Sequence, residues 1–436
     1  MQRAWRHGIR GTAILPLLLL LSTICSLLVG AAEGGQVTLT CWGWKYTIDC
    51  LKDSLAEFNQ AYPQIKVDLK IRAPQDIYQR LPKAINAGAG GPDVVVLENS
   101  HLPQVMSTGG LLDLTAWASA YKAKYTAAQW RACLWKDRVL ALPWDSGPVG
   151  LWYRRDVLEK AGYKPDPESV AALFETWQGL AAAAKEIKER LGIYIFAFSA
   201  GQNDGRLFEQ ILQQQGLGYF DEQGRVILDR PEAVNALEIL GGLYKEGLIQ
   251  DAIPWTDAWY AGIRDGAVAS IPAAVWMGGF IKSWIAPGTA GNWGVVPLPL
   301  PAKGRGVRTS NDGGCSLAVL KQTKKAAAAW SFIQFMSARA ETQVKMLRGH
   351  DSFPAFMDAY ADPFFAEPDP FFGGQAYHKL FADLAPQIPV WHFTENYAQA
   401  NSLCSTEIQA YLLGRQDAKT ALARAAANIR AKIKKR

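Results

Sequence analysis

The fold class is set by residues 37–97, which read VTLTCWGWKYTIDCLKDSLAEFNQAYPQIKVDLKIRAPQDIYQRLPKAINAGAGGPDVVVL. Residues 37–41 and 65–71 alternate apolar and polar side chains as strands do, and residues 94–97 form the short apolar run of a buried strand. Between these strands, apolar residues recur three and four positions apart from Ile48 to Phe58 and from Tyr78 to Ile85, which predicts helices. Strand, helix, strand, helix, strand predicts an α/β domain with a largely parallel sheet.

A second α/β region follows the first. Its sequence predicts a helix over 168–190, a strand over 193–198, helices over 206–215 and 232–245, and a last helix over 417–436. The stretch 351–372 is rich in Phe and Pro, which predicts an ordered, packed loop. Two α/β regions in a chain of 436 residues predict two lobes with a cleft between them.

The N-terminus has the three parts of a secretory signal peptide. Three arginines lie within the first ten residues, an apolar run extends to Val29, and small residues end at Ala32. We therefore expect residues 1–32 to be removed on export to the periplasm, rather than kept as a membrane anchor. Cys25 is preceded by Ile24 instead of a small residue, so we expect no lipid anchor there and a soluble mature protein.

Charge and cysteine usage narrow the functional classes. Loss of the three arginines lowers the formal net charge from +6 to +3. The sequence contains no stripe of basic and aromatic residues, so it does not indicate a nucleic-acid-binding protein. The histidines are scattered and the cysteines lack zinc spacing, so we predict no metal site. We also predict no cofactor, because no phosphate-binding loop or dinucleotide fingerprint is found. Cys41 and Cys50 could form a disulfide in an oxidising compartment, but their spacing leaves this open.

The aromatic content points to flat contact surfaces. The chain has 16 Trp, 15 Tyr and 17 Phe, a content that keeps lectins, sugar-binding proteins and glycosidases in consideration. A glycosidase needs two carboxyl groups at a defined separation. The 40 acidic residues offer many pairs and no spacing selects one, so an exported glycoside hydrolase, with Glu98 and Asp145 as its acids, stays the alternative to a binding protein.

The mature chain resembles the extracellular solute-binding proteins of carbohydrate ABC importers, the group that includes maltose-binding protein. Similar segments occur in the family's order, among them FNQAYPQIKV (58–67), GPDVV (91–95), LPWDSGPVGLWYRRD (142–156), WMGGF (276–280), GVVPLP (294–299), AAAAWSFIQFMS (326–337) and GRQDA (414–418). The WMGGF segment is more similar to the lactose- and arabino-oligosaccharide-type branch. Arg154 departs from the family pattern, in which Asn or Asp commonly follows the Tyr.

This resemblance implies the two-lobed periplasmic-binding-protein fold, hinged near 145–148 and 296–299 and closing on a sugar. It implies a first lobe of residues 33–145 and 299–350 and a second lobe of residues 146–298 and 351–436. It also implies a monomer with no catalytic role that delivers an oligosaccharide to the permease subunits of an ABC importer. A sensory binding protein of the same fold, coupled to a chemoreceptor, stays open.

The candidate binding residues lie where strands end or where the chain crosses between lobes. Ligands in such sheets bind beyond the carboxyl ends of the strands. We expect Trp276 to be the best stacking platform. Trp42 and Trp44 should point in opposite directions, so we expect only one of them to face the cleft. We expect Glu98 to accept hydrogen bonds from ligand hydroxyl groups. Trp177 and Trp330 are assigned to helix cores, Trp255, Trp259 and Trp391 are secondary candidates, and Asn203-Asp204 caps a helix. The full candidate set is Trp42, Trp44, Glu98, Asn99, Trp144, Asp145, Trp276, Met277, Asp312 and Gly313.

Overall fold

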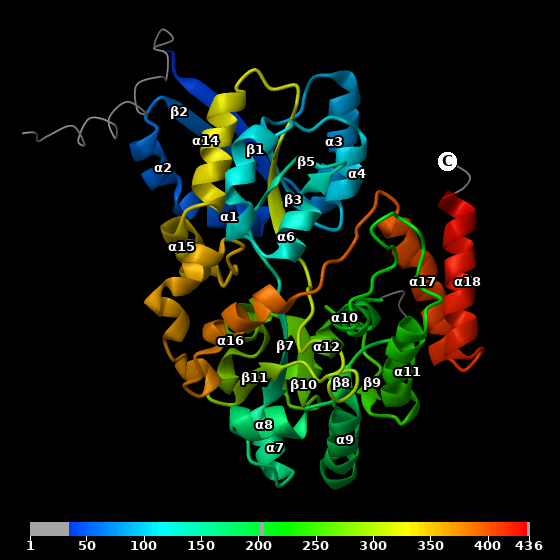
Figure 1. Ribbon diagram of the computed structural model, residues 1–436. Coiled ribbons are helices and arrows are strands. Elements are labelled where there is room, and N and C mark those ends of the chain that lie inside the picture. Colours follow the sequence, from blue (N-terminus) through cyan, green and yellow to red (C-terminus); the bar gives the residue numbers. More distant parts are fainter. Residues whose placement is uncertain (1–34, 201–204, 434–436) are drawn as a thin grey trace, which may run out of the picture.

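The computed structural model describes residues 35–200 and 205–433 and forms two lobes, one above the other in Figure 1. The predicted signal peptide and the predicted cap at Asn203-Asp204 lie outside these residues. No helix in the described part of the chain is both long and apolar enough to cross a membrane.

The first lobe is built on a five-stranded sheet in the order β2 (Ile65–Ile71), β1 (Val37–Gly43), β3 (Val94–Glu98), β12 (Cys315–Val319) and β6 (Leu142–Pro143). β1 runs parallel to β2 and β3, as the sequence predicts, whereas β12 returns antiparallel to β3. The helix expected from Ile48 to Phe58 is two helices that meet at Ser54, α1 (Lys45–Asp53) and α2 (Leu55–Ala61). Their apolar sides and that of α14 (Ala326–Ser337) share one hydrophobic core with the sheet.

The second lobe has an antiparallel sheet in the order β10 (Ser270–Ala274), β7 (Val149–Arg154) and β11 (Trp293–Pro297). The strand expected over 193–198 is only β8 (Phe196–Ala197), paired in parallel with β9 (Ile249–Gln250). The helix expected over 168–190 is split into α8 (Pro167–Leu173) and α9 (Trp177–Leu191), because the Thr176 hydroxyl accepts the Gly179 N–H and starts a new helix.

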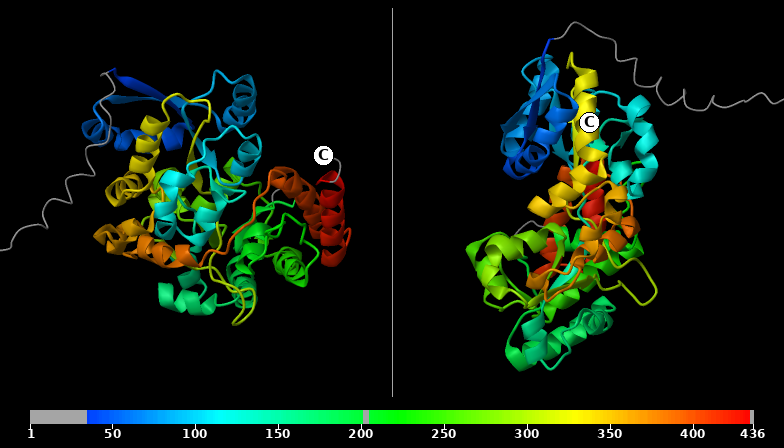
Figure 2. Two further views of the ribbon diagram at one scale, coloured as in Figure 1. Left: turned by 45° about the horizontal axis from the view of Figure 1, so that its top comes forward. Right: turned by 90° about the vertical axis from the view of Figure 1, so that its left-hand side faces the viewer.

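The remaining elements cover the two sheets and join them (Figures 1 and 2). α17 (Tyr397–Leu412) and α18 (Ala418–Ile433) lie side by side and pack with α11 (Pro231–Lys245) on the core of the second lobe. In the stretch 351–372, Phe353, Phe365 and Phe372 are buried, which confirms a packed loop. The other elements are α3 (Pro74–Ala87), α4 (Leu102–Ser107), α5 (Thr115–Ala118), η1 (Ser119–Lys124), α6 (Ala127–Ala132), β4 (Leu134–Trp135), β5 (Arg138–Val139), α7 (Arg155–Lys160), α10 (Arg206–Gln214), α12 (Asp257–Arg264), α13 (Trp276–Phe280), η2 (Ile281–Ile285), η3 (Pro287–Thr289), α15 (Ala340–His350), η4 (Met357–Ala361), η5 (Pro363–Ala366), η6 (Pro370–Phe372), α16 (Tyr377–Leu384) and η7 (Ala385–Gln387).

Three described segments cross between the lobes, and the second crosses later than the sequence suggested. The first runs from β6 to β7 through residues 145–148, as expected. The chain does not leave the second lobe at 296–299, because the Leu298 N–H donates to the Arg308 carbonyl and the Thr309 hydroxyl donates to the Val149 carbonyl. It returns only between Asn311, which bridges to Pro148, and Cys315, where β12 begins. Residues 299–311 therefore lie with the second lobe rather than the first.

The third crossing follows α15. Ser146 donates its N–H to the Phe353 carbonyl and Asp145 bridges to Pro354, so this segment runs beside the first crossing. Ala355 and Phe356 pack into the core of the first lobe. The chain therefore changes lobe several residues later than the expected position at 350–351.

Cys41 and Cys50 are separate, buried thiols, so the disulfide that the sequence left open is not formed. Both thiols belong to the core of the first lobe, where burial raises their pKa well above the ordinary value. They pack as small apolar side chains there.

Candidate functional site

A cavity between the lobes consists of two adjoining chambers. The first, of about 340 Å³, is named the aromatic chamber, and the second, of about 430 Å³, the polar chamber. Both volumes lie within the range of ~300–1,000 Å³ typical of small-ligand sites. The chambers share Glu98, Arg206 and the segment Asp312–Gly314. The aromatic chamber is otherwise lined by Trp44, Tyr46, Asp145, Ser146, Trp255, Trp276, Phe280, Cys315, Ser352 and Phe353, and the polar chamber by Ser100, His101, Glu209, Gln210, Gln213, Asn311, Trp391, Phe393, Tyr397, Ala398 and Asn401.

The second lobe supplies a fixed aromatic wall to the aromatic chamber. Trp276 begins α13 directly after β10, and its indole N–H donates to the Asp312 carbonyl at 3.1 Å. The Trp276 ring centroid lies 6.0 Å from that of Trp255 and 5.3 Å from that of Phe280. Because a hydrogen bond and two ring contacts hold it, Trp276 offers a preorganised surface to a ligand.

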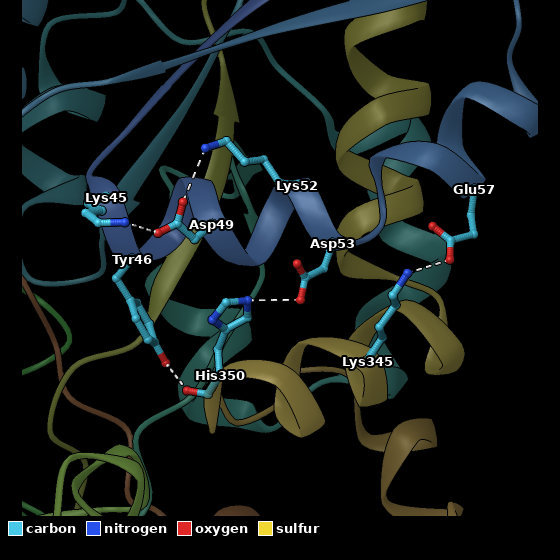
Figure 3. A network of polar contacts seen from close by, with 8 residues as sticks. All are labelled: Lys45, Tyr46, Asp49, Lys52, Asp53, Glu57, Lys345 and His350. Carbon is cyan, nitrogen blue, oxygen red and sulfur yellow. Dashed lines mark hydrogen bonds and ion pairs between the residues drawn. The ribbon is translucent and has the colours of Figure 1, made fainter. Parts of the chain in front are cut away.

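The first lobe faces this wall with Trp44 and Tyr46, at the start of α1. The Tyr46 hydroxyl donates to the carbonyl of His350, the last residue of α15, at 3.0 Å (Figure 3). In the same network His350 contacts Asp53 at 3.0 Å, and Lys345 pairs with Glu57 at 2.5 Å. The helix that leads into the third crossing is thereby tied to the helix that carries the chamber's Tyr46.

The shared segment Asp312–Gly314 requires glycine. Gly313 and Gly314 have φ values of +94° and +93°, in the left-handed region that favours glycine. A Cβ on Gly314 would also lie 2.9 Å from the amide nitrogen of Asn99. Without side chains here, the backbone itself forms the floor of both chambers.

Asp145 joins all three crossings. Its carboxylate accepts a short hydrogen bond from the Cys315 N–H and a 3.3 Å bond from the Ser352 hydroxyl. Burial raises the pKa of Asp145 to about 6, and the nearby charge of Glu98 adds to this effect. Protonation of this group would alter the point where the two lobes meet.

The polar chamber holds a positioned carboxylate, Glu209 of α10. It accepts from the Tyr397 hydroxyl at 2.9 and 3.1 Å and from the Asn401 amide at 2.7 Å. Burial, reinforced by the charge of Glu209, raises the pKa of Tyr397, so the phenol stays a donor. A fixed carboxylate is a strong acceptor for ligand hydroxyl groups.

Three buried polar atoms of residues that line the polar chamber make no hydrogen bond within the described protein. They are Oε1 of Gln210, Oδ1 of Asn311 and the indole nitrogen of Trp391. A buried polar group without a partner costs about 1–3 kcal/mol, so a water or a ligand hydroxyl is expected to complete this wall.

Six of the ten sequence-predicted residues line these chambers: Trp44, Glu98, Asp145, Trp276, Asp312 and Gly313. The other four do not. Trp42 is 8% exposed and Trp144 is 1% exposed, and each packs inside a hydrophobic cluster of the first lobe. Met277 is buried and lines a small cavity of about 70 Å³ that adjoins the aromatic chamber at Trp255 and Trp276, and Trp259 lines this cavity as well.

Asn99 has a structural role beside the site. Its amide donates to Gln129 at 2.9 Å and accepts from the Ser316 hydroxyl at 2.7 Å, and its N–H donates to the Gly314 carbonyl. It therefore holds the backbone floor from beneath. Of Trp42 and Trp44, the alternation argument places only one in the cleft, and the structure identifies it as Trp44.

Sequence reasoning missed most of the polar chamber. Arg206, Glu209 and Gln213 recur three and four positions apart on a predicted helix, and this polar stripe was the available signal. Tyr46, Phe280, Tyr397 and Asn401 carry no comparable pattern. Trp255 and Trp391, secondary candidates in the sequence, line the chambers.

The helix tryptophans and Arg154 have packing roles. Trp177 is buried in the core of the second lobe, as predicted, and Trp330 packs half-buried against the first core. Arg154 is buried, pairs with Asp156 at 2.8 Å and donates to the carbonyl of Ile263, so it supports the second lobe from outside the chambers.

Comparison with known proteins identifies the family. The family profile of bacterial extracellular solute-binding proteins matches residues 47–343, well over half of the chain. The chain belongs to this family. The resemblance seen in the sequence and the two-lobed fold that it implied are thereby confirmed.

Individual relatives agree with this assignment. The chain is 28% identical over 374 residues to a lactose-binding protein of Rhizobium radiobacter, covering 83% of this chain and 85% of the relative. It is 26% identical over 373 residues to an arabinooligosaccharide-binding protein of Halalkalibacterium halodurans, covering 83% and 81%. A solved ABC-transporter-associated binding protein from B. animalis subsp. lactis, in complex with β-1,6-galactobiose, matches with a TM-score of 0.71 and 26% identity over 91% of this chain and 96% of that one.

Proposed function

We propose that this solute-binding protein captures a sugar outside the cytoplasmic membrane and delivers it to the permease of an ABC importer. The observation that carries the proposal is the aromatic chamber, where Trp276 and Trp255 of the second lobe face Trp44 of the first beside the buried Asp145 and the partly exposed Glu98. A sugar ring has apolar C–H faces that stack on indoles and hydroxyl groups that donate to carboxylates. The chamber combines both kinds of contact.

The position of the cavity between the lobes supports a closing mechanism. A sugar in the aromatic chamber would contact both lobes and the three crossings at Asp145, Asp312 and Ser352. A ligand that contacts both lobes favours the closed arrangement in proportion to its extra contacts there. The permease then distinguishes the loaded protein by its closed shape.

An oligosaccharide is the preferred ligand class. Two adjoining chambers give room for more than one sugar unit, and the relatives named above bind lactose, arabino-oligosaccharides and galactobiose. The proposal includes removal of residues 1–32 on export, a soluble periplasmic location and action as a monomer.

A thermal-shift screen followed by calorimetric titration tests this function. The panel contains monosaccharides, lactose, β-1,6-galactobiose and arabino-oligosaccharides, with a peptide and a polyamine as other ligand classes. A sugar at one hundred times its Kd stabilises the protein by about 2.7 kcal/mol, which raises Tm measurably. A shift with the peptide or polyamine and with no carbohydrate would refute the proposed ligand class. Turnover of any glycan would favour the hydrolase alternative.

A further inference from the structure

A row of aromatic side chains continues from the aromatic chamber to the protein surface. Trp276, Phe280 and Trp284 are spaced four residues apart along α13 and the following turn η2. The ring centroids of Trp276 and Phe280 are 5.3 Å apart, and those of Phe280 and Trp284 are 5.5 Å apart. Tyr260 of α12 packs edge-on against Trp284 at 5.1 Å. Phe280, Trp284 and Tyr260 are called the outer row below.

The outer end of this row is open to solvent. The Trp284 side chain is 48% exposed, and its indole N–H has no hydrogen-bond partner among the described residues. Of the six large hydrophobic residues exposed in the described chain, Trp284 and Trp255 both contact Phe280. Exposed apolar surface gathered in one place marks a binding surface.

The backbone beneath the row is also unusual. η2 is a π-helical turn, in which the Ala286 N–H donates to the Ile281 carbonyl, and such turns are frequent at functional sites. Trp255 has a φ of +69°, a conformation that bulky side chains rarely adopt. The local backbone thus departs from regular geometry at Trp255 and at Trp284, and both of these side chains contact Phe280.

We infer that the outer row is a stacking platform for the end of an oligosaccharide that projects from the aromatic chamber. This inference rests on the proposed function. A sugar is favoured over a protein partner because the row is continuous with the ligand chamber through Trp276 and Phe280, and because tryptophan presents a flat face together with an unpaired donor. The outer row would make affinity depend on ligand length.

The test measures Kd by calorimetry for Trp284→Ala against an oligosaccharide series of one linkage, starting from the shortest member that binds. We expect an unchanged Kd for the shortest member and a loss of about fivefold to tenfold for longer members, the size of one aromatic contact. Trp117→Ala is the matched control, because Trp117 is 39% exposed and stacks on Trp330 of the first lobe. This control should bind every length as the unmodified protein does.

The outcomes separate the two proposals. If Trp284→Ala binds every length normally, or loses the same factor at every length, the outer row is not a sugar platform. If Trp284→Ala keeps all affinities but lowers the ATPase stimulation of the reconstituted permease at saturating sugar, the row is a permease contact and the inference is overturned. If no oligosaccharide binds the unmodified protein, the proposed oligosaccharide ligand is refuted, and the inference about the outer row is refuted with it.

Discussion

The two lobes contribute different chemistry to the same cavity. The second lobe presents Trp255, Trp276 and Phe280 as an exposed aromatic wall and Glu209 as a fixed carboxylate. The first lobe buries Trp42 and Trp144 in its hydrophobic clusters and exposes mainly Trp44, Tyr46 and Glu98. A tryptophan at the end of a strand can therefore pack against the sheet or face the ligand. The outcome depends on the side of the backbone from which its side chain projects.

Substitution of Trp42 and of Trp44 should separate these two uses of tryptophan. Trp42→Ala should lower the free energy of unfolding by about 3–5 kcal/mol, the cost of removing a buried indole, and leave sugar affinity nearly unchanged. Trp44→Ala, two residues along, should lose affinity with a much smaller loss of stability. Urea unfolding and calorimetric titration of both variants provide the measurement. A loss of affinity without a loss of stability in Trp42→Ala would show that the first lobe also has an aromatic wall.

The free energy of unfolding should depend on pH through Asp145, which joins the three crossings. Its pKa of about 6 in the folded protein lies above the ordinary value of 3.8, so the folded state holds this proton more tightly than the unfolded chain. Its contribution to stability is therefore full below about pH 4 and declines as the pH rises to about 6. Asp145→Asn, which mimics the protonated form, should gain up to about 3 kcal/mol relative to the unmodified protein between pH 4 and pH 7. Urea unfolding at both pH values measures the gap, and a gap that does not change with pH would contradict the assignment.

The carboxylates of the two lobes should differ in their importance for binding. Glu209→Gln should weaken affinity for an oligosaccharide that reaches the polar chamber by about tenfold to a hundredfold, since bonds to charged groups contribute ~1.5–3 kcal/mol. Glu98→Gln should cost less, because Glu98 is partly exposed and lies 3.2 Å from His101. Calorimetric titration of both variants with one sugar compares them. A larger effect of Glu98→Gln would reverse the proposed ranking of the lobes.

The hydrogen bond between α1 and α15 should contribute only modestly to stability. Tyr46→Phe removes the hydroxyl that donates to the His350 carbonyl, so it should lower the free energy of unfolding by about 0.5–1.5 kcal/mol. Because the ring that lines the aromatic chamber remains, sugar affinity should change by less than about threefold. Thermal unfolding and titration check both values, and a loss of affinity well above that limit would mean that the hydroxyl itself binds the sugar.

Periodicity in the sequence predicted three strands of the first lobe but not the sheet of the second lobe. The alternation at 65–71 matches β2 because one face of that strand is buried, and the apolar run at 94–97 matches β3 because both faces are. The second lobe has an antiparallel sheet whose strands lie far apart in the sequence, so its pairing leaves no local signal. The second crossing lies later than expected because the Leu298 N–H and the Thr309 hydroxyl bond to distant backbone carbonyls, and local periodicity does not reveal such contacts.

For the site, the sequence predicted the residues that directly follow strands or occupy crossings, such as Trp276 and Asp145. It missed Tyr397 and Asn401 because these residues come from a helix more than a hundred residues away from α13 and reach the polar chamber only through tertiary packing. Met277, adjacent to Trp276, lines the small adjoining cavity instead of the aromatic chamber, because neighbouring residues on a helix point in different directions.

If the aromatic wall of the second lobe dominates sugar binding, titration of one oligosaccharide into Trp276→Ala and Trp44→Ala should show a clear difference between the two lobes. Trp276 has the features of an energetically dominant contact, since it is aromatic, fixed by the Asp312 carbonyl and set among other rings. We expect Trp276→Ala to stay folded and to lose at least about thirtyfold in affinity, and Trp44→Ala to lose clearly less. Equal losses, or a larger loss for Trp44→Ala, would contradict this account.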